Sequence, residues 1–240
     1  MHAARVPNLI QLVGHGVIQG QPLLVTAPWG RTLTIDDSAA VILSAVSAAA
    51  ETLQAMGNLP EPTCHGDISL GNLIVVCSHQ QNISDCKTYV LDWVTMRKEQ
   101  QGEMAECKEA TGTLTFMAIS VLEGFANTIS ADLESLALIL IFLAGRAQCD
   151  WAFVQHVKIS SNVKQVSLMQ PKQWRRWADS RIQSDTLRHA ADRLRDLFWG
   201  SSHSTAYLDN YNDAVRPSQF LQALQEPPPQ PQHPQLSTGS

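Results

Sequence analysis

Several side chains that can handle phosphate chemistry lie in two short stretches of the chain. His65, Asp67 and Asn72 follow the spacing H-x-D-x-x-x-x-N, and Asp92 stands twenty residues beyond Asn72, between Leu and Trp. A carboxylate can orient and deprotonate an attacking hydroxyl, and carboxylate and amide oxygens are hard ligands that hold Mg²⁺ on phosphates. These residue types at this spacing therefore indicate phosphoryl transfer.

A helix and two strands must position these side chains. An alanine-rich helix is predicted from about Asp36 to Met56, because apolar residues recur there at intervals of three and four. The loop that carries the first motif follows this helix and leads into a strand over Leu73–Val76. A second strand over Thr88–Leu91 ends directly before Asp92, which predicts a hairpin.

The remaining elements are predicted from the same patterns. Apolar runs at 8–13 and 23–25 flank the glycines of Gly14–Gly20, which predicts a hairpin with its turn in that segment. The stretch Ala131–Ala144 is apolar on nearly every side and should be an enclosed helix. The pattern over Trp174–Trp199 predicts one or two amphipathic helices with a solvated face. The composition of 226–240 predicts an extended, disordered Pro/Gln-rich tail.

Charge and composition narrow the class of protein. The 240 residues carry 17 Lys and Arg against 22 Asp and Glu, a formal charge of −5. Such a chain has no broad positive field, which disfavours nucleic acid as a partner. The first thirty residues show no secretory leader, so we expect a cytoplasmic location.

Two further expectations concern the membrane and the cysteines. The longest apolar run, Leu136–Ala144, is too short to cross a bilayer, so no membrane anchor is expected. The five cysteines form no C-x-x-C pair, which favours reduced thiols over a disulfide framework or a zinc site.

The motifs and their order resemble the protein kinase superfamily, with a catalytic loop at His65–Asn72 and a metal-binding acid at Asp92. Gly112–Ala118 (G-T-L-T-F-M-A) is similar to the end of an activation segment. The run D-L-E-S-L, whose first residue is Asp132, is similar to the beginning of the central helix of the large lobe. Arg216 resembles the arginine that the family carries near the C-terminal end of its large lobe, here called the late arginine. The residues of these motifs are most similar to those of the fungal-type protein kinases. The resemblance covers residues 5 to about 225.

This resemblance implies an α+β, protein-kinase-like fold. Residues 1–34 would be a remnant of the β-rich small lobe with the hinge, 35–225 a mostly helical large lobe, and 226–240 the tail. The implied activity is transfer of the ATP γ-phosphate to serine or threonine of a protein. ATP, Mg²⁺ and a protein substrate or partner are the implied binding partners, without nucleic acid or membrane.

The resemblance also implies roles for particular residues. The catalytic residues would be Asp67, as the base, and Asn72. Asn72 and Asp92 would bind magnesium. The backbone of Ala27 to Trp29, within a hinge at Val25–Gly30, would meet the adenine edge, and Ile74 would lie beneath the adenine.

Three other residues would act as scaffold by the same resemblance. His65 would support the loop from beneath. Thr113 would lie near Asp67, and Asp132 would hold the backbone of the catalytic loop.

The sequence departs from the family pattern in several places. The glycine-rich loop, the strand lysine and the helix glutamate would all lie before Val6, and the first lysine of the chain is Lys87. Gly66 replaces a common arginine, and Trp-Val replaces Phe-Gly after Asp92. Ser120 stands where a glutamate usually pairs with the late arginine, Arg216, so that ion pair cannot form.

Three interpretations follow from these departures. The first is a truncated form of a longer kinase with impaired activity. The second is a pseudokinase that acts as a binding module. The third is a small-molecule phosphotransferase of the aminoglycoside or choline type, because the H-G-D form and the tryptophan after Asp92 resemble those enzymes as well.

Overall fold

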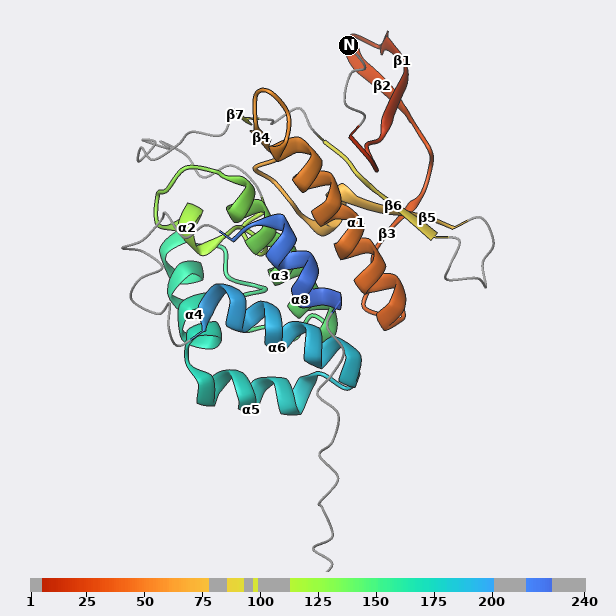
Figure 1. The fold of residues 1–240 in the computed structure, drawn as a ribbon. Helices are drawn as coiled ribbons and strands as arrows, with labels where there is room; N and C mark the ends of the chain where they lie inside the picture. Colours follow the sequence, from red (N-terminus) through yellow and green to blue (C-terminus); the bar gives the residue numbers. More distant parts are fainter. Residues whose placement is uncertain (1–5, 78–85, 93–96, 99–112, 201–214, 226–240) are drawn as a thin grey trace, which may run out of the picture.

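A computed structural model describes residues 6–77, 86–92, 97–98, 113–200 and 215–225 (Figure 1). Its strands are β1 (Gln11–Ile18), β2 (Gln21–Ala27), β3 (Arg31–Thr32), β4 (Thr63–Cys64), β5 (Leu73–Cys77), β6 (Cys86–Val90) and β7 (Arg97–Lys98). Its helices are α1 (Ala39–Gly57), the 3₁₀ helix η1 (Leu70–Asn72), α2 (Ile119–Leu122), α3 (Ile129–Ala144), α4 (Val157–Met169), α5 (Pro171–Arg181), α6 (Asp185–Trp199) and α8 (Pro217–Gln225). The described part of the chain is thus mostly helical, with three small antiparallel sheets.

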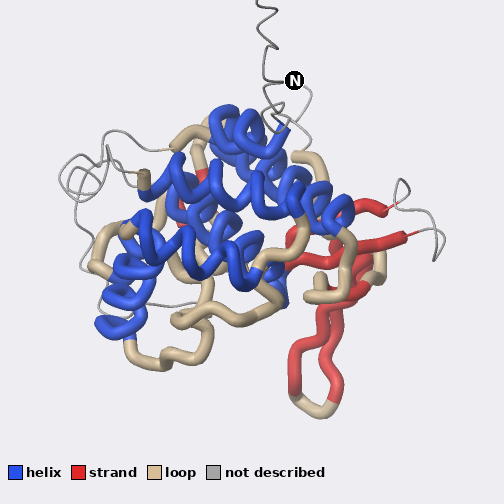
Figure 2. Tube along the Cα trace, turned by 90° about the horizontal axis from the view of Figure 1, so that it is seen from below, coloured by secondary structure: helices blue, strands red, loops and turns tan. Residues whose placement is uncertain are grey.

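The first hairpin, β1–β2, projects from the helices as a long two-stranded ribbon (Figure 2). Its turn is the pair Gln19–Gly20, where both residues have positive φ angles of 51° and 79°. A two-residue turn of this kind matches the twist of the strands it joins. The hairpin was predicted, but the predicted position of its turn was too broad, because Gly14 and Gly16 lie inside β1.

The chain then passes from the hairpin to the sheet β3-β5-β6. A cis peptide bond joins Ala27 to Pro28 at the end of β2. Gly30 passes so close to β5 that a Cβ atom there would meet the Val75 carbonyl oxygen at 2.6 Å. A glycine is therefore needed for the close approach of this connection to the sheet.

The core of the fold is formed by α3 and the elements around it. Fourteen of the sixteen residues of α3 are buried, and the helix packs against α1, α6 and α8. The enclosed helix predicted at 131–144 is confirmed, and it begins two residues earlier, at Ile129, because the Thr128 hydroxyl caps the Ala131 N–H. Helix α1 begins at Ala39 for a similar reason, since the Ser38 hydroxyl accepts from the Val41 N–H at 3.4 Å.

Helix α1 is long and apolar enough to cross a bilayer when judged by length and composition alone. Half of its most apolar 18-residue window is buried inside the fold. Its apolar stripe packs against α3, α8 and β6, so the stripe serves the protein core. The sequence prediction considered a different segment, Leu136–Ala144, which lies in α3.

The predicted helical stretch 174–199 consists of two helices, α5 and α6. The alternating charges of α6 do not all face solvent. Arg195 is only 5% exposed, and its guanidinium donates to the carbonyls of Leu168 and Met169 at 2.8 and 3.1 Å. It thereby pairs carbonyl groups at the end of α4 that the helix itself cannot satisfy.

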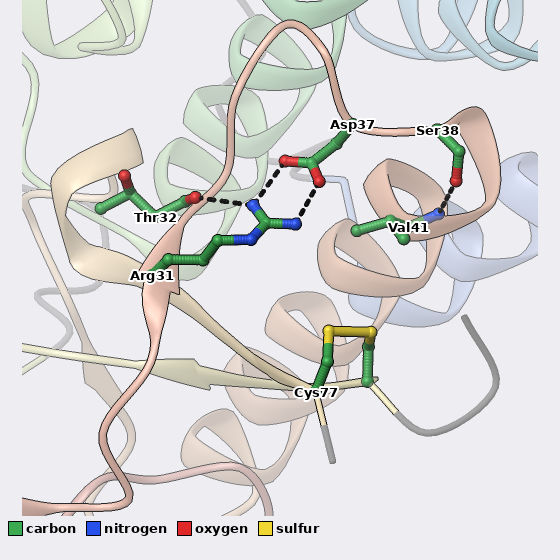
Figure 3. Close-up of a disulfide and its surroundings, with 7 residues drawn as sticks. Arg31, Thr32, Asp37, Ser38, Val41 and Cys77 are labelled. Atoms are coloured by element: carbon green, nitrogen blue, oxygen red, sulfur yellow. Dashed lines mark hydrogen bonds and ion pairs between the residues drawn. A yellow bond between two sulfur atoms is a disulfide. The ribbon is translucent and has the colours of Figure 1, made fainter. Parts of the chain in front are cut away.

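The prediction of reduced thiols is wrong for two of the five cysteines. Cys77 and Cys86 stand opposite each other in the β5–β6 ladder and form a disulfide (Figure 3). The spacing rule missed this pair because β pairing, not sequence proximity, brings the two residues together. Cys64 and Cys149 are buried thiols, and burial raises the pKa of Cys149. Cys107 and the predicted tail lie outside the described residues.

Figure 3 also shows the ion pair that holds the turn between β3 and α1. The Arg31 guanidinium donates to both carboxylate oxygens of Asp37, one of them at 2.8 Å. Burial works against the charge on Asp37, but the bonds from Arg31 and the Thr34 N–H outweigh it and lower the pKa of this carboxyl.

Phe220 supplies a test of the helical core, because it is fully buried where α8 meets α1 and α6. Phe220→Ala should lower the free energy of unfolding by about 3–5 kcal/mol, through lost burial and the cavity left behind. Chemical denaturation followed by circular dichroism measures this change. Ser218→Ala, at an exposed position on the same helix, is the control and should change stability by less than about 0.5 kcal/mol. Equal effects would contradict the packing described for α8.

Candidate active site

His65 lies beneath the loop between β4 and β5 and organises it. The side chain is fully buried. Its Nε2 lies 2.7 Å from the Leu91 carbonyl oxygen, and its Nδ1 accepts from the Asp67 N–H at 3.2 Å. These partners assign the neutral form with the proton on Nε2. Burial lowers the pKa of His65, and the Leu91 carbonyl and the carboxylates of Asp67 and Asp92 oppose that shift.

Asp132, near the start of α3, holds the backbone of the same loop. Its carboxylate accepts from the N–H groups of His65 and Gly66 at 2.5 and 2.9 Å. Both the contact predicted for Asp132 and the supporting position of His65 are thus observed. Gly66 has a φ angle of +81°, a conformation in which an arginine side chain would be strained. Backbone geometry therefore favours the glycine that departs from the family pattern.

Asp67, Asn72 and the strand end at Asp92 are joined by short hydrogen bonds. The Asn72 side-chain N–H donates to the Asp67 carbonyl at 2.8 Å. The backbone carbonyl of Asn72 accepts from the Leu91 N–H at 2.8 Å. Asp92 follows Leu91 directly and has a φ angle of +58°. These two bonds link the loop that carries Asp67 and Asn72 to the strand end that precedes Asp92, so the fold brings the three predicted residues near one another.

Thr113 extends this cluster toward α2. Its N–H donates to Oδ1 of Asp67 at 2.9 Å, so the predicted proximity of Thr113 and Asp67 is observed. A cavity of about 10 Å³ lies beside this bond, lined in part by Asp67, Asn127, Asp132 and Ser135. Such a cavity is at the lower limit for one water molecule.

The donor set can be compared with the needs of a magnesium ion. Within the described residues, no three His, Cys, Asp or Glu side chains gather as a metal site. Asn72 and Asp92 instead offer an amide and a carboxylate. The Asn72 amide nitrogen is turned to the Asp67 carbonyl, which leaves its oxygen as the ligand atom. Two protein oxygens suit Mg²⁺, which takes its other ligands from phosphates and water, so these residues fit the ion.

The residues predicted to meet adenine lie in two places: Ala27 to Trp29 at the end of β2 and on its connection to β3, and Ile74 in β5. Ala27 is half-buried beside the cis bond, and the Trp29 side chain is 90% exposed. Ile74 is buried in β5, opposite Thr32 of β3 and Tyr89 of β6. Gly30 closely approaches Val75, the residue after Ile74 in β5. The end of the predicted hinge therefore lies next to the strand that carries Ile74.

Two buried charged residues near the cluster were missed by the sequence analysis. Glu134 lies on α3 and Lys164 on α4, and both are fully buried. The spacing in α4 could have indicated that Lys164 is buried. Lys164 stands four residues from Ser160 and from Leu168, so it shares the buried face of the helix with them. Burial lowers the pKa of Lys164 to about 7, and the charge of Glu134 opposes this shift.

The fold is similar to that of a solved protein kinase. One matching solved structure is that of vaccinia related kinase 3, with a TM-score of 0.58 and 16% identity over 90% of this chain and 72% of that chain. A search of curated proteins found no match. The protein therefore has the predicted α+β, protein-kinase-like fold.

The family assignment is more specific. The model for the fungal protein kinase family matches residues 20–144, just over half of the chain. The chain therefore belongs to the fungal protein kinase family, as its motifs indicated.

Asp132→Asn tests the anchoring of the loop that carries Asp67. An amide presents one N–H₂ group in place of an oxygen, so the N–H of His65 or of Gly66 loses its acceptor. We expect the free energy of unfolding to fall by about 1–3 kcal/mol, the cost of an unpaired buried polar group. Urea denaturation measures it, with the exposed Asp36→Asn as control. A loss no larger than that of the control would show that the two bonds do not hold the loop.

The lowered pKa of His65 predicts how stability depends on pH. Between the folded-state pKa and about 6.5, the unfolded chain binds more protons than the folded chain. The free energy of unfolding should therefore decline as pH falls below about 6.5, toward the lower pKa of His65 in the folded state. Urea midpoints across this range should show a smaller decline for His65→Gln than for the wild type. An equal decline in both would contradict the assignment.

Proposed function

We propose that this protein transfers the γ-phosphate of ATP to serine or threonine hydroxyls of a protein substrate. The observation that carries the proposal is the cluster of Asp67, Asn72 and Asp92. These residues come from two separate stretches and are joined by the bonds of Asn72 to Asp67 and to Leu91. Membership of the fungal protein kinase family supports it.

Asp67 is the residue that would receive the proton of the acceptor hydroxyl. Its Oδ1 accepts from the Thr113 N–H, so Oδ2 is the oxygen that would accept the hydroxyl proton. The bond from Thr113 also fixes the plane of the carboxylate. Orientation matters here because phosphoryl transfer depends mainly on positioning and electrostatics.

Asn72 and Asp92 would hold Mg²⁺ through the amide oxygen and the carboxylate. The ion, when bound, would neutralise charge on the phosphate oxygens. The chain's own contribution is to keep these two residues together, through the bond from the Leu91 N–H to the backbone carbonyl of Asn72.

The adenine would lie beside the backbone of residues 27–29, because the close approach of Gly30 to Val75 leaves no room for a ring between that residue and β5. Backbone groups from Ala27 to Trp29 would face its polar edge, and Ile74 would supply an apolar surface beneath the ring. The Trp29 side chain itself is exposed, so only its backbone is given a role.

We expect slow transfer by these 240 residues. They contain no lysine before Lys87, so a small-lobe lysine paired with a helix glutamate is not available to the ATP phosphates. Each tenfold loss of rate corresponds to about 1.4 kcal/mol of lost transition-state stabilisation. The same observation favours a second candidate, a pseudokinase that binds a partner without catalysis.

Radiolabelled ATP with Mg²⁺ and casein provides the direct test. We expect the wild type to label casein, and Asp67→Asn to lower the rate by about 10²–10⁴-fold, because general-base catalysis is lost. The control is Asp36→Asn, an exposed carboxylate far from the cluster in sequence, which should keep the wild-type rate.

Binding and acceptor choice separate the alternatives. ATP with Mg²⁺ should raise the melting temperature of the wild type, since a ligand that binds the folded state stabilises it. The same shift without any transfer would favour the pseudokinase. Transfer to choline or an aminoglycoside, but not to casein, would favour a small-molecule phosphotransferase.

A further inference from the structure

Helix α5 carries an open groove on its outward face. The groove has a volume of about 590 Å³, and its described lining consists of exposed residues of α5: Pro171, Lys172, Arg175, Arg176, Asp179 and Ser180. In Figure 1, α5 lies at the bottom of the helical part, and the strands that lead to the candidate active site lie toward the opposite side. The groove is therefore separate from that site.

Three of the lining residues are cations on one side of the helix. Arg175 and Arg176 stand three and four residues after Lys172, so the three side chains are neighbours on the helix surface, and like charges at this spacing repel one another. They also lie in the first half of α5, whose first turn has no acidic residue. The N-terminal end of a helix is the positive end of its dipole. A bound anion would therefore relieve two unfavourable interactions at once.

Within the part of the chain that the structure describes, no carboxylate forms an ion pair with these three cations. Asp179, the acid of the groove lining, is paired with Arg188 of α6 at 2.8 Å. Arg188 also holds Asp192 at 2.9 Å, and Asp192 accepts from the indole N–H of Trp174 at 2.7 Å. Asp179 and Asp192 are thus engaged by other donors, and the positive charge of the groove is left for a ligand.

The inner face of α5 keeps the groove in place. Trp174 and Ala178 are buried, and the indole N–H of Trp177 donates to the Gln148 carbonyl at 2.9 Å. The ring of Trp177 also packs against those of Trp151 and Trp174, with centroid distances of 6.4 and 5.2 Å. Because the backbone of α5 is anchored in this way, a ligand would not have to order it, which favours binding.

The dimensions of the groove indicate the kind of anion that fits. Residues 171–180 span about 15 Å of helix, and Lys172 and Arg176 are about 6 Å apart along its axis. In an extended polypeptide, alternate side chains point to the same side and repeat about every 6.6–7 Å. Carboxylates at alternate positions would therefore meet two cations of α5 at once. A single phosphate group concentrates its charge at one point and does not span the groove.

We propose that the groove of α5 is a docking surface for an acidic segment of a partner protein, in which glutamate or aspartate recurs at alternate positions. The guanidinium groups of Arg175 and Arg176 each take a carboxylate through two parallel hydrogen bonds, and Lys172 supplies a third charge. Charge complementarity of this kind governs the choice of partner and the rate of association. The proposal concerns binding alone, so it does not depend on the proposed function.

Fluorescence anisotropy with labelled peptides tests the proposal. The probe is a decapeptide of alternating glutamate and glycine, and the comparison peptide has glutamine in place of each glutamate. We expect the full chain to bind the acidic peptide at least about tenfold more tightly than the glutamine peptide. Its affinity for the acidic peptide should fall as NaCl is raised from about 50 to about 300 mM, because salt screens exposed charges.

Substitutions in the groove localise the binding. Arg175→Gln combined with Arg176→Gln should raise the Kd for the acidic peptide by at least about fivefold, since two charged hydrogen-bond donors are lost. Lys172→Gln should raise the Kd about twofold. Lys158→Gln is the matched control, because it removes the same charge from an exposed position on α4 and should leave the Kd unchanged. All four side chains are exposed, so circular dichroism should show wild-type melting temperatures for these variants.

Several outcomes would overturn the proposal. Equal binding of the acidic and the glutamine peptide, or no binding of either, would show that the groove does not recognise acidic segments. An unchanged Kd in the variant that lacks both arginines would place the binding elsewhere. Tighter binding of duplex DNA or of phosphatidylserine vesicles, lost in the same variant, would assign the groove to another class of polyanion. A chain that binds the acidic peptide but transfers no phosphate contradicts only the proposed function.

Discussion

The arrangement of the active-site cluster depends on one buried carboxylate. Asp132, on the rigid and almost fully buried helix α3, accepts from two consecutive N–H groups of the loop that carries Asp67. Neighbouring N–H groups that point the same way need a paired acceptor when they are buried. An ionised carboxylate meets this need with bonds stronger than neutral ones. The loop therefore takes its position from the centre of the helical core, and so does Asp67.

The same helix also holds the second loop of the site. Glu134 stands two residues after Asp132 and accepts from the Ile119 N–H, so the short run D-L-E serves two loops on different sides of α3. Lys164 adds a hold from α4, and the Thr113–Asp67 bond joins the two loops. The loop that carries Asp67 and the segment 114–119 are thus both attached to α3, an element that cannot move without disturbing the core.

Much of the architecture could be predicted because it follows from local patterns. The helical stripe of α1, the enclosed helix α3 and the β5–β6 pair all come from periodicity, which depends only on which side chains share a face. The bonds of Asp132 and Thr113 were predicted from the motif resemblance and are observed. The turn of the first hairpin was misplaced, because glycine permits a positive φ angle but does not require it. The Cys77–Cys86 disulfide was missed, because it depends on strand register.

Local sequence patterns predicted helices α1, α3, α5 and α6, the hairpins β1–β2 and β5–β6, and the family motifs with their phosphate-handling residue types, but not helices α2, α4 and α8. Packing of the whole chain sets which polar groups meet across it: Asp132 bonds the loop 67 residues before it, and Lys164 bonds carbonyls 47 and 50 residues before it. The physical reason is that helix and strand patterns come from neighbours a few residues apart. A buried charge is satisfied by whichever backbone groups the packed core leaves without partners. Those groups are defined only when all the elements are in place.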